Sequence, residues 1–482
     1  MNNRAVFHLI SYTLGFISLF LGGCWLVSVH FDDPAAAQHA LAVSAGITFI
    51  CAAIMWGATR GRIDLSRRDG FGIVTFGWLG ASLFGCLPFL LSGVVSHPVD
   101  ALFETMSGFT TTGASVLTDL ESLPKGILFW RALTQWIGGM GVLVLCVAIL
   151  PFLGVGGMQI YRAEMPGPSK DRLTPRIART AEYLWGVYVV LSLLEILLLR
   201  LGGLSWFDAC CHTFATISTG GFSTRTDSVG AFNSAYMETV VVVFMLLSAI
   251  NFALHFRAIR GQPLGYARDP ECRAFLTIWG LGCLALTASI WGRGSPSLTE
   301  SLRAAVFQCT SILTTTGFAT ADFNAWPNVA RTTLLLLMFI GGCAGSTAGS
   351  MKIIRVMVIT KMMVRELRTT MLPRAVIQVK VGGNVVERDV AANIGVFFII
   401  FVLVFSGATV LMSLWMPNLV SAASSVIASL GNIGPGLDAV GPTATFASVP
   451  APGKLVLTAC MLLGRLELFT VLIMLMPGFW RK

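Results

Sequence analysis

Long apolar segments alternate with short polar loops along almost the whole chain. From residue 71 onward one pattern occurs four times: an apolar span, a short segment that ends in a run of Thr and Gly, and a second apolar span. The short segments, of about 13 residues, fall below the roughly 20 helical residues that cross a bilayer. They are therefore predicted to enter and leave the membrane on one side. The first spans are expected at about 71–94, 179–201, 271–292 and 392–415, and the second near 126–152, 237–258, 331–350 and 454–476.

The four short segments resemble one another in sequence. They read ALFETMSGFTTTGAS, ACCHTFATISTGGFS, AVFQCTSILTTTGFA and AASSVIASLGNIGPG. In each, an alanine stands twelve residues before a glycine, and the pairs are Ala101 and Gly113, Ala209 and Gly221, Ala305 and Gly317, and Ala422 and Gly434. Internal repeats fix an architecture, and four copies predict four elements around one axis. The fold class is therefore an all-α integral membrane protein with four tandem repeats of span, pore helix, loop and span around a pseudo-fourfold pore.

Two further spans, at residues 6–29 and 38–59, precede the first repeat and are joined by the acidic turn Asp32-Asp33-Pro34. The apolar run after Arg4 is long enough to remain as a span, so no cleaved signal is expected. These two spans bring the expected total to ten. The expected units are an N-terminal hairpin at 1–68 and four repeats at 69–165, 166–265, 266–375 and 376–482.

Composition agrees with a membrane protein. Only 12% of the 482 residues are charged and the mean hydropathy is +0.76, whereas soluble proteins carry about 25% charged residues. The net charge of +9 does not indicate nucleic-acid binding, because 21 of the 33 Lys and Arg fall in four short loops, at 60–68, 160–180, 255–273 and 351–389. Basic loops mark the cytoplasmic side, so both termini are predicted to be cytoplasmic. The eleven cysteines show no metal-binding spacing.

The re-entrant segments are then expected on the opposite face. Their flanks carry a modest acidic bias that can draw cations toward a pore mouth. Each residue taken alone is at least as well explained as a turn residue or a helix cap. The acidic residues are Asp119, Glu121, Asp227, Asp322 and Asp438.

The Thr/Gly runs carry the predicted chemistry. Non-helical backbone at membrane depth is tolerated only where protein buries it or where it lines a water-filled path, and its carbonyl oxygens can replace the hydration shell of a monovalent cation. The glycines permit the required backbone angles; the alternative is ordinary packing of small residues between helices. The residues predicted to bind the ion are Thr110, Thr111, Thr112 and Gly113, Ser218, Thr219, Gly220 and Gly221, Thr314, Thr315, Thr316 and Gly317, and Gly431, Asn432, Ile433 and Gly434.

Two features near the end of repeats 3 and 4 bear on control of the pore. Residues 331–370 would form a helix of about 60 Å, twice the membrane thickness, so the segment is predicted to break at the small-residue string 341–350. Packing of small residues is the main alternative; phosphate binding is not favoured, because no strand precedes the string. Arg465 lies within the last span, where an ionisable residue is a functional candidate. Its structural alternative is a partnership with Glu467 or with carbonyl groups.

Other polar residues have weaker assignments. Glu104, His212 and Gln308 occupy one aligned position on the pore helices, where they can make a common contact behind the loops, although capping or contact with water is the favoured interpretation. Arg131 and Arg303 are interpreted as helix-end residues that extend to water. A basic stripe follows the break, formed by Lys352, Arg355, Lys361, Arg365 and Arg368, and faces either anionic lipid or a cytosolic partner.

The fourfold unit of span, pore helix, TTG loop and span resembles the Trk/Ktr/HKT superfamily of cation transporters over nearly the whole chain. The two extra N-terminal spans are similar to its Trk branch. In the superfamily a glycine in every loop goes with potassium and a serine in the first loop with sodium, so Gly113, Gly221, Gly317 and Gly434 imply potassium. The fourth loop departs from the TTG pattern at Asn432-Ile433-Gly434, so its wall is expected to differ in shape.

The resemblance also implies a gate and partners. In the superfamily the small-residue string is an intramembrane loop that blocks the path below the filter, and an arginine at the position of Arg465 projects into the pore. A bacterial inner-membrane location, a homodimer and a cytosolic nucleotide-binding regulator of the TrkA type are implied as well, with potassium as the transported ion and no organic cofactor. The implied gate residues are Gly341, Gly342, Gly345, Ser346, Thr347, Ala348, Gly349 and Arg465.

The predicted function is potassium uptake through a single filter. A sodium-selective or proton-coupled symporter is the alternative, for which Glu467 and Glu195 are the acidic candidates within spans. An intramembrane enzyme is disfavoured because no span holds paired aspartates and the histidines lie mostly at span ends. A scaffold without a conduction path is a third alternative.

Overall fold

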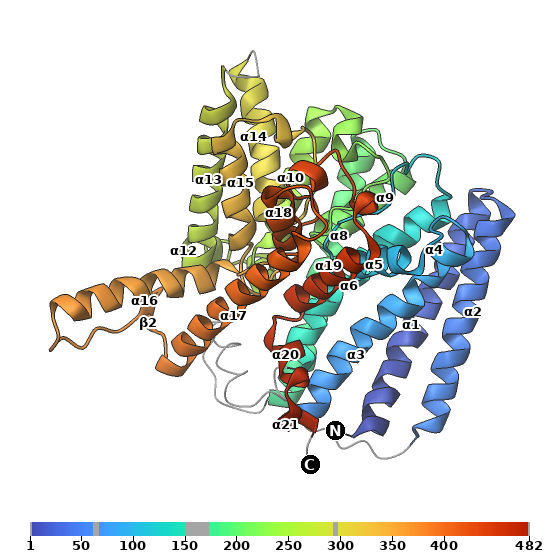
Figure 1. The fold of residues 1–482 in the computed structure, drawn as a ribbon, viewed down its shortest axis with the longest axis horizontal. Coiled ribbons are helices and arrows are strands. Elements are labelled where there is room, and N and C mark those ends of the chain that lie inside the picture. The colour runs from blue at the N-terminus through green and yellow to red at the C-terminus, as the bar shows by residue number, and fades with distance from the viewer. Residues whose placement is uncertain (1, 61–66, 150–172, 293–296, 481–482) are drawn as a thin grey trace.

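The computed structural model describes residues 2–60, 67–149, 173–292 and 297–480, most of them in helices (Figure 1). The N-terminal hairpin consists of α1 (Asn3–His30) and α2 (Ala35–Ala58), which pack along their lengths at one side of the molecule. Asp33, in the turn between them, accepts hydrogen bonds from the backbone N–H groups of Lys125 (2.9 Å) and Gly126 (2.7 Å). A carboxylate is stabilised at the N-terminus of a helix, so this turn holds the second span of repeat 1.

Each repeat begins with a span and a short buried helix. The first spans are α3 (Arg67–Gly85) continued by α4 (Leu87–Leu91), α8 (Leu173–Leu201), α13 (Pro270–Ile290) and α17 (Arg388–Met412). The pore helices are α5 (Pro98–Phe109), α9 (Trp206–Ile217), α14 (Leu298–Leu313) and α18 (Leu419–Leu430). Side chains of Ser205, Ser297 and Asn418 cap three of the pore helices by accepting backbone N–H groups in the first turn, the usual signal for a helix start.

The second spans differ from one another. They are α6 (Lys125–Ile149), α10 (Ala235–Ala249) with α11 (Phe252–Ile259), α15 (Asn328–Ile340) followed by α16 (Ile353–Met371), and α19 (Ala451–Arg465) with α20 (Phe469–Leu475). The shorter elements are α12 (Gly265–Arg268), α21 (Pro477–Trp480), the 3₁₀ turns η1 (Ser228–Phe232), η2 (Phe323–Ala325), η3 (Asp438–Val440) and η4 (Phe446–Ser448), and a hairpin of β1 (Lys380–Val381) and β2 (Asn384–Val385).

The predicted break in repeat 3 is present, and two further breaks occur that the sequence did not indicate. The chain bends by 103° between α10 and α11 and by 117° between α19 and α20. At the first bend Asn251 starts a new helix, because its side chain accepts the N–H of Ala253 (2.9 Å). At the second, Glu467 and Leu468 both have positive φ (57° and 50°). Neither bend contains the glycine or proline that marks a break in a sequence.

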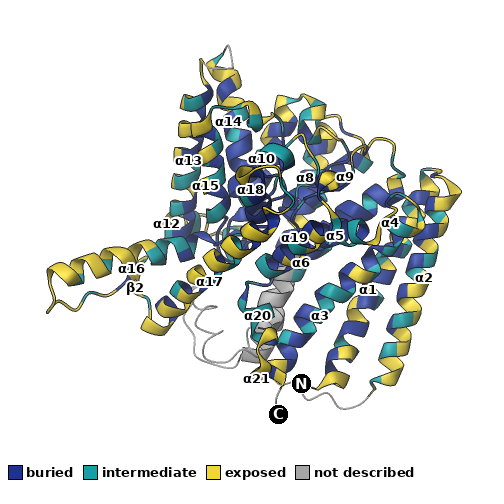
Figure 2. Cartoon of the chain, in the orientation of Figure 1, coloured by how far each residue is buried: buried dark blue, intermediate teal, exposed yellow. Residues whose placement is uncertain are grey.

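The predicted fold class of a helical membrane protein is confirmed. Among the described residues, six helices are long and apolar enough to span a membrane, and the two bent pairs raise this number to eight. Apolar side chains cover the outer faces of the spans, as for Leu19 on α1, Leu284 on α13 and Leu403 on α17, each more than 60% exposed. The pore helices at the centre are mostly buried (Figure 2). An apolar exterior around a polar centre is the arrangement that a bilayer requires.

Candidate ion-conduction site

The four Thr/Gly loops share one backbone conformation. Each has a residue in the left-handed region two positions before its glycine, and the glycine also has positive φ. The first of these residues are Thr111 (53°), Thr219 (54°), Thr315 (59°) and Asn432 (53°). The glycines are Gly113 (82°), Gly221 (77°), Gly317 (85°) and Gly434 (102°). Four matching loops in one buried region give the centre of the molecule approximate fourfold symmetry.

The loops meet in a closed ring. A Cβ atom added to each glycine would collide with a backbone carbonyl oxygen of the next loop, and the fourth glycine returns to the first loop. The pairs, glycine first, are Gly113 with Gly220, Gly221 with Thr316, Gly317 with Ile433, and Gly434 with Thr112. Glycine is therefore required at each position for two reasons: the positive φ angle and the close approach of the neighbouring carbonyl oxygen.

The fourth loop has the same pattern of positive φ angles as the others, and it differs from them in the residues Gly431, Asn432 and Ile433. Asn432 donates from Nδ2 to the hydroxyl of Thr112 (2.9 Å) and to the carbonyl of Met461 (3.0 Å). The same hydroxyl also bonds that of Thr110 within the first loop (2.8 Å). The amide of Asn432 tolerates the left-handed region well, so Asn can stand where the other loops have Thr.

The aligned residues Glu104, His212 and Gln308 are buried and make a common contact behind the loops, so the favoured interpretation as caps or water-facing residues was wrong. Each binds the chain that leaves its own loop. Glu104 accepts from the N–H of Val116 (2.9 Å), and His212 bonds the hydroxyl of Ser223 (3.0 Å). With its amide oriented to accept, Gln308 binds the N–H of Thr320 (2.8 Å). These contacts fix the segment that leaves each of the first three loops to the pore helix of that repeat.

Charged side chains link the repeats in cyclic order. Arg131 joins repeat 1 to the carbonyl of Ser223 in repeat 2 (2.9 Å), and Arg303 pairs with Glu238 between repeats 3 and 2 (2.6 Å). Arg331 pairs with Asp438 between repeats 3 and 4, and Lys454 with Asp100 between repeats 4 and 1 (2.8 Å). Arg131 is therefore buried and does not extend to water as expected, whereas Arg303 is partly exposed. Both hold neighbouring repeats together.

The flanking acidic residues mostly have structural partners. Asp438 pairs with Arg331, Asp322 accepts the N–H of Asn324 (2.9 Å), and Glu121 accepts both the hydroxyl and the N–H of Thr226. The hydroxyl bond from Thr226 lowers the pKa of Glu121 below its ordinary value. Glu121 thus stays ionised at neutral pH, while the charge of Asp438 is offset locally.

We expect Arg131→Met to destabilise the protein strongly. Arg131 and Glu104 form a buried ion pair (2.6 Å), and removal of one partner from such a pair costs about 3–5 kcal/mol because the other charge is left buried. Arg303→Met is the control, since the Arg303 side chain is 42% exposed and an exposed pair contributes about 1 kcal/mol or less. Thermal unfolding in detergent measures both variants, and equal losses would contradict the prediction.

The small-residue string forms an ordered loop, residues 341–352, between α15 and α16, and lies against the ring. The N–H of Gly349 donates to the hydroxyl of Thr315 in the third loop (2.7 Å). The hydroxyl of Thr347 donates to the carbonyls of Ile217, where α9 ends, and of Ser248 in α10 (both 3.1 Å). Contacts with the third Thr/Gly loop and with helices of repeat 2 place this segment directly beneath the ring.

Arg465 reaches the same segment. Its guanidinium donates to the carbonyl of Thr347 (2.9 Å) and to that of Gly138 in α6 (3.1 Å). Glu467, the alternative partner considered for it, pairs with Arg355 at the start of α16 (2.6 Å). Arg465, in repeat 4, therefore binds carbonyls of repeats 1 and 3.

The sequence analysis did not single out Glu271. One oxygen of its buried carboxylate accepts the N–H groups of Ala344 (2.7 Å) and Ile354 (3.0 Å), one near each end of the 341–352 loop. Only its place near the start of an apolar span could have drawn attention to it. Glu271 holds the two ends of the loop close together, because the N–H groups of Ala344 and Ile354, ten residues apart, bind the same carboxylate oxygen.

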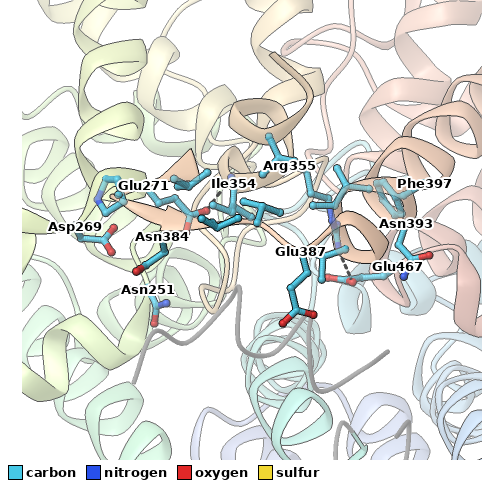
Figure 3. A pocket seen from close by; sticks show the side chains of 18 of the residues that line it. Asn251, Asp269, Glu271, Ile354, Arg355, Asn384, Glu387, Asn393, Phe397 and Glu467 are labelled. Atoms are coloured by element: carbon cyan, nitrogen blue, oxygen red, sulfur yellow. Dashed lines mark hydrogen bonds and ion pairs between the residues drawn. The ribbon is translucent and has the colours of Figure 1, made fainter. Parts of the chain in front are cut away.

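A cavity of about 260 Å³ lies beside Glu271 and the start of α16. Figure 3 shows Glu271 at one side of it and the Arg355–Glu467 pair at the other, with Asp269, Glu387 and Phe397 along the wall. Carboxylates outnumber cations among these residues. In the described part of the chain no group of three or more His, Cys, Asp or Glu is arranged to hold a metal ion.

The basic stripe does not act as one surface. Lys352 and Arg355 are buried, at the end of the loop and against Glu467. Lys361, Arg365 and Arg368 lie farther along α16, which projects from the body of the protein with the hairpin beside it (Figure 1). The expected stripe is therefore wrong for Lys352 and Arg355, and a surface that faces lipid or a partner stays a prediction for the residues beyond Arg355.

These features define a class of protein: an integral membrane protein for cation transport, in which four re-entrant loops form one ring. The sequence profile of the TrkH family, described as cation transport proteins, matches residues 39–481. The chain belongs to the TrkH family. It is 43% identical to the Trk system potassium uptake protein TrkH of Halomonas elongata and 43% identical to that of Vibrio parahaemolyticus, in both cases over 100% of each chain. The crystal structure of the potassium transporter TrkH from Vibrio parahaemolyticus matches with a TM-score of 0.91 and 40% identity over 100% of both chains.

Proposed function

We propose that the chain carries potassium into the cell across the inner membrane, and that the four Thr/Gly loops form its selectivity filter. The closed ring of glycines and carbonyls is the observation that carries this proposal. A ring of backbone carbonyls can replace the hydration shell of a monovalent cation, and the surrounding contacts from Glu104, His212 and Gln308 hold the loops in place. The relatives in Halomonas and Vibrio are named as potassium uptake proteins.

The loop 341–352 and Arg465 form the gate in this proposal. The loop lies under the ring and is bonded to repeats 2 and 3, and Arg465 ties it to repeat 1. A fixed positive charge beneath the filter also repels a cation that leaves it. In this proposal the loop 341–352 and the charge of Arg465 together block the ion path beneath the filter.

Arg465→Ala is expected to raise cation flux without changing selectivity, because it removes the charge, one bond to the loop and one bond to α6 while the ring is untouched. Initial rates of rubidium-86 uptake into proteoliposomes, with and without competing sodium, provide the measurement. Arg303→Ala is a suitable control, since this arginine lies on a pore helix away from the loop 341–352. Unchanged flux for Arg465→Ala would leave this residue with a structural role only.

The proposal includes a homodimer and a cytosolic nucleotide-binding regulator of the TrkA type, with both termini in the cytoplasm. The relatives are named as members of a Trk system, which supports a second component. The exposed basic residues of α16 offer it a surface near the gate. The two termini lie at the same end of the molecule (Figure 1), which supports their placement on one side of the membrane.

Rubidium-86 uptake by the purified chain in proteoliposomes tests the function. External potassium should compete and external sodium or lithium should not. Equal competition by sodium would favour the sodium-selective alternative. Absence of flux both from the wild-type chain and from a folded variant without the gate loop would overturn the proposal.

Cation–proton symport is a second candidate, and one observation favours it. The carboxylate of Glu195, on α8, is fully buried, and both of its oxygens lack a hydrogen-bond partner in the described parts of the chain. Such a carboxylic acid can carry a proton within a membrane. An imposed pH gradient separates the candidates: it should drive rubidium uptake against its own gradient only in a symporter.

A further inference from the structure

Three successive carbonyl groups at the centre of the gate loop bind cationic side chains. The ammonium group of Lys352 donates to the carbonyls of Ala348 (2.5 Å) and Ser346 (3.4 Å). The carbonyl of Thr347, between them, accepts from Arg465 (2.9 Å). Buried carbonyls usually accept from backbone N–H groups. Among the described residues, no backbone N–H donates to these three carbonyls.

The backbone of Lys352 is unusual as well. Lys352 has a φ of 62° immediately before α16, in the region that non-glycine residues rarely occupy. It is only 7% exposed, and its side chain folds back into the loop that precedes it. Such a conformation costs about 1–3 kcal/mol, and burial of an ammonium group costs more unless oxygen ligands surround it. The carbonyls of the loop are therefore arranged to hold a positive charge.

We propose that the carbonyl oxygens of Ser346 and Ala348 form a binding site for a monovalent alkali cation beneath the filter, and that the Lys352 ammonium occupies this site when the gate is closed. An ammonium group and a potassium ion carry the same charge and are of similar size, and both bind carbonyl oxygen. When the gate opens, the lysine leaves and a transported cation takes its place. The inference rests on the proposed filter and gate, and it assigns the gate loop a second cation site.

The location fits a site on the ion path. Residues on both sides of Ala348 contact the ring region, Thr347 through the carbonyl of Ile217 and Gly349 through the hydroxyl of Thr315. A cation that leaves the filter toward the cytoplasm therefore meets these carbonyls next. A lysine suits this role better than an arginine, because its ammonium is a compact point charge on a flexible stem. A lysine that serves only as a structural brace is the competing explanation.

Removal of the tethered charge distinguishes the two explanations. In Lys352→Met the carbonyls lose their occupant, so rubidium should bind there and raise the midpoint of thermal unfolding more than it does in the wild-type protein. The purified full-length chain is titrated with rubidium chloride at constant ionic strength, with N-methyl-D-glucamine as the replacement cation. Lys361→Met is the matched control: this lysine lies on α16, which follows Lys352, and it also binds a backbone carbonyl, that of Lys380 (2.5 Å), but on the exposed surface.

The expected result is a larger rubidium-dependent rise for Lys352→Met than for wild type and Lys361→Met, which should match each other. An equal rise in all three proteins would overturn the proposal. If Lys352→Met does not fold, acetylation of lysines in the wild-type protein, followed by mass spectrometry, gives a second measurement. Rubidium should then speed the modification of Lys352 and not of Lys361, because it displaces the buried ammonium; an unchanged rate at Lys352 would also overturn the proposal.

These measurements detect binding and do not need transport. If the proposed function were wrong, rubidium-86 flux would be absent from every variant, whereas the unfolding experiment would still report on the site. If only the site were wrong, wild-type flux would be selective and the rubidium-dependent rise would be the same with and without Lys352. The flux and unfolding measurements thus distinguish a failure of the proposed function from a failure of the proposed cation site.

Discussion

Gly113→Ser is expected to abolish most of the discrimination between potassium and sodium. A Cβ at this position would overlap the carbonyl oxygen of Gly220 in the neighbouring loop, and the φ of 82° is unfavourable for serine. The ring can admit the side chain only if one carbonyl turns away or the loops separate. Backbone strain of about 1–3 kcal/mol corresponds to roughly 5- to 150-fold in a preference between two ions. Competition by sodium against rubidium-86 uptake in proteoliposomes measures the change.

Gly203→Ser is the matched control for this variant. Gly203 also has positive φ, 96°, but a Cβ there would meet no atom within 4 Å. The Gly203→Ser variant therefore reproduces the backbone strain of a serine with positive φ, but it does not disturb any contact between loops. Intact selectivity in Gly203→Ser together with its loss in Gly113→Ser would assign the effect to the ring. Selectivity that survives in Gly113→Ser would place the discrimination elsewhere.

Deletion of Gly345–Gly349 is expected to raise cation flux by about tenfold or more. It removes the hydroxyl of Thr347, the N–H of Gly349 that binds Thr315, and the carbonyls that bind Arg465 and Lys352. Loss of interactions worth only 1.4 kcal/mol changes an equilibrium tenfold, so the closed arrangement should lose its advantage. Initial rates of rubidium-86 uptake provide the measurement.

Thr347→Val serves as the milder comparison for the deletion. It keeps the length of the loop and the carbonyl that binds Arg465, and it removes only the hydroxyl bonds to Ile217 and Ser248. Its flux should lie between those of the wild-type protein and the deletion. Unchanged or abolished flux in a well-folded deletion variant would count against the gate.

Much of the architecture could be predicted from the sequence because it is periodic. Apolar length gives the spans, and the recurrence of Thr and Gly at matched positions gives the four short loops and the need for Gly113, Gly221, Gly317 and Gly434. The break in repeat 3 was predictable because ten residues of the string 341–350 are small or polar and the helix would otherwise be too long. Each of these inferences uses only local composition and spacing.

Partners across the ring could not be predicted in this way. The sequence places Glu467 two residues from Arg465, but it pairs with Arg355, 112 positions away. Nothing local indicates that Glu271 binds both ends of the gate loop, or that Asn251 restarts a helix after a 103° bend. Local sequence suggests only that Arg131 and Arg303 lie near helix ends, because their acidic partners, Glu104 and Glu238, lie in other segments.

The sequence by itself determined that this is a four-repeat membrane protein with glycine at each loop, because span length, charge and repetition are written along the chain. Only the tertiary structure decided which carbonyl each glycine approaches, which charges are neutralised, and that Lys352 and Arg465 both bind the loop beneath the ring. The reason is physical. Periodicity specifies which face of a helix is buried, whereas hydrogen bonds and ion pairs depend on atoms brought within about 3 Å of one another by packing of distant segments.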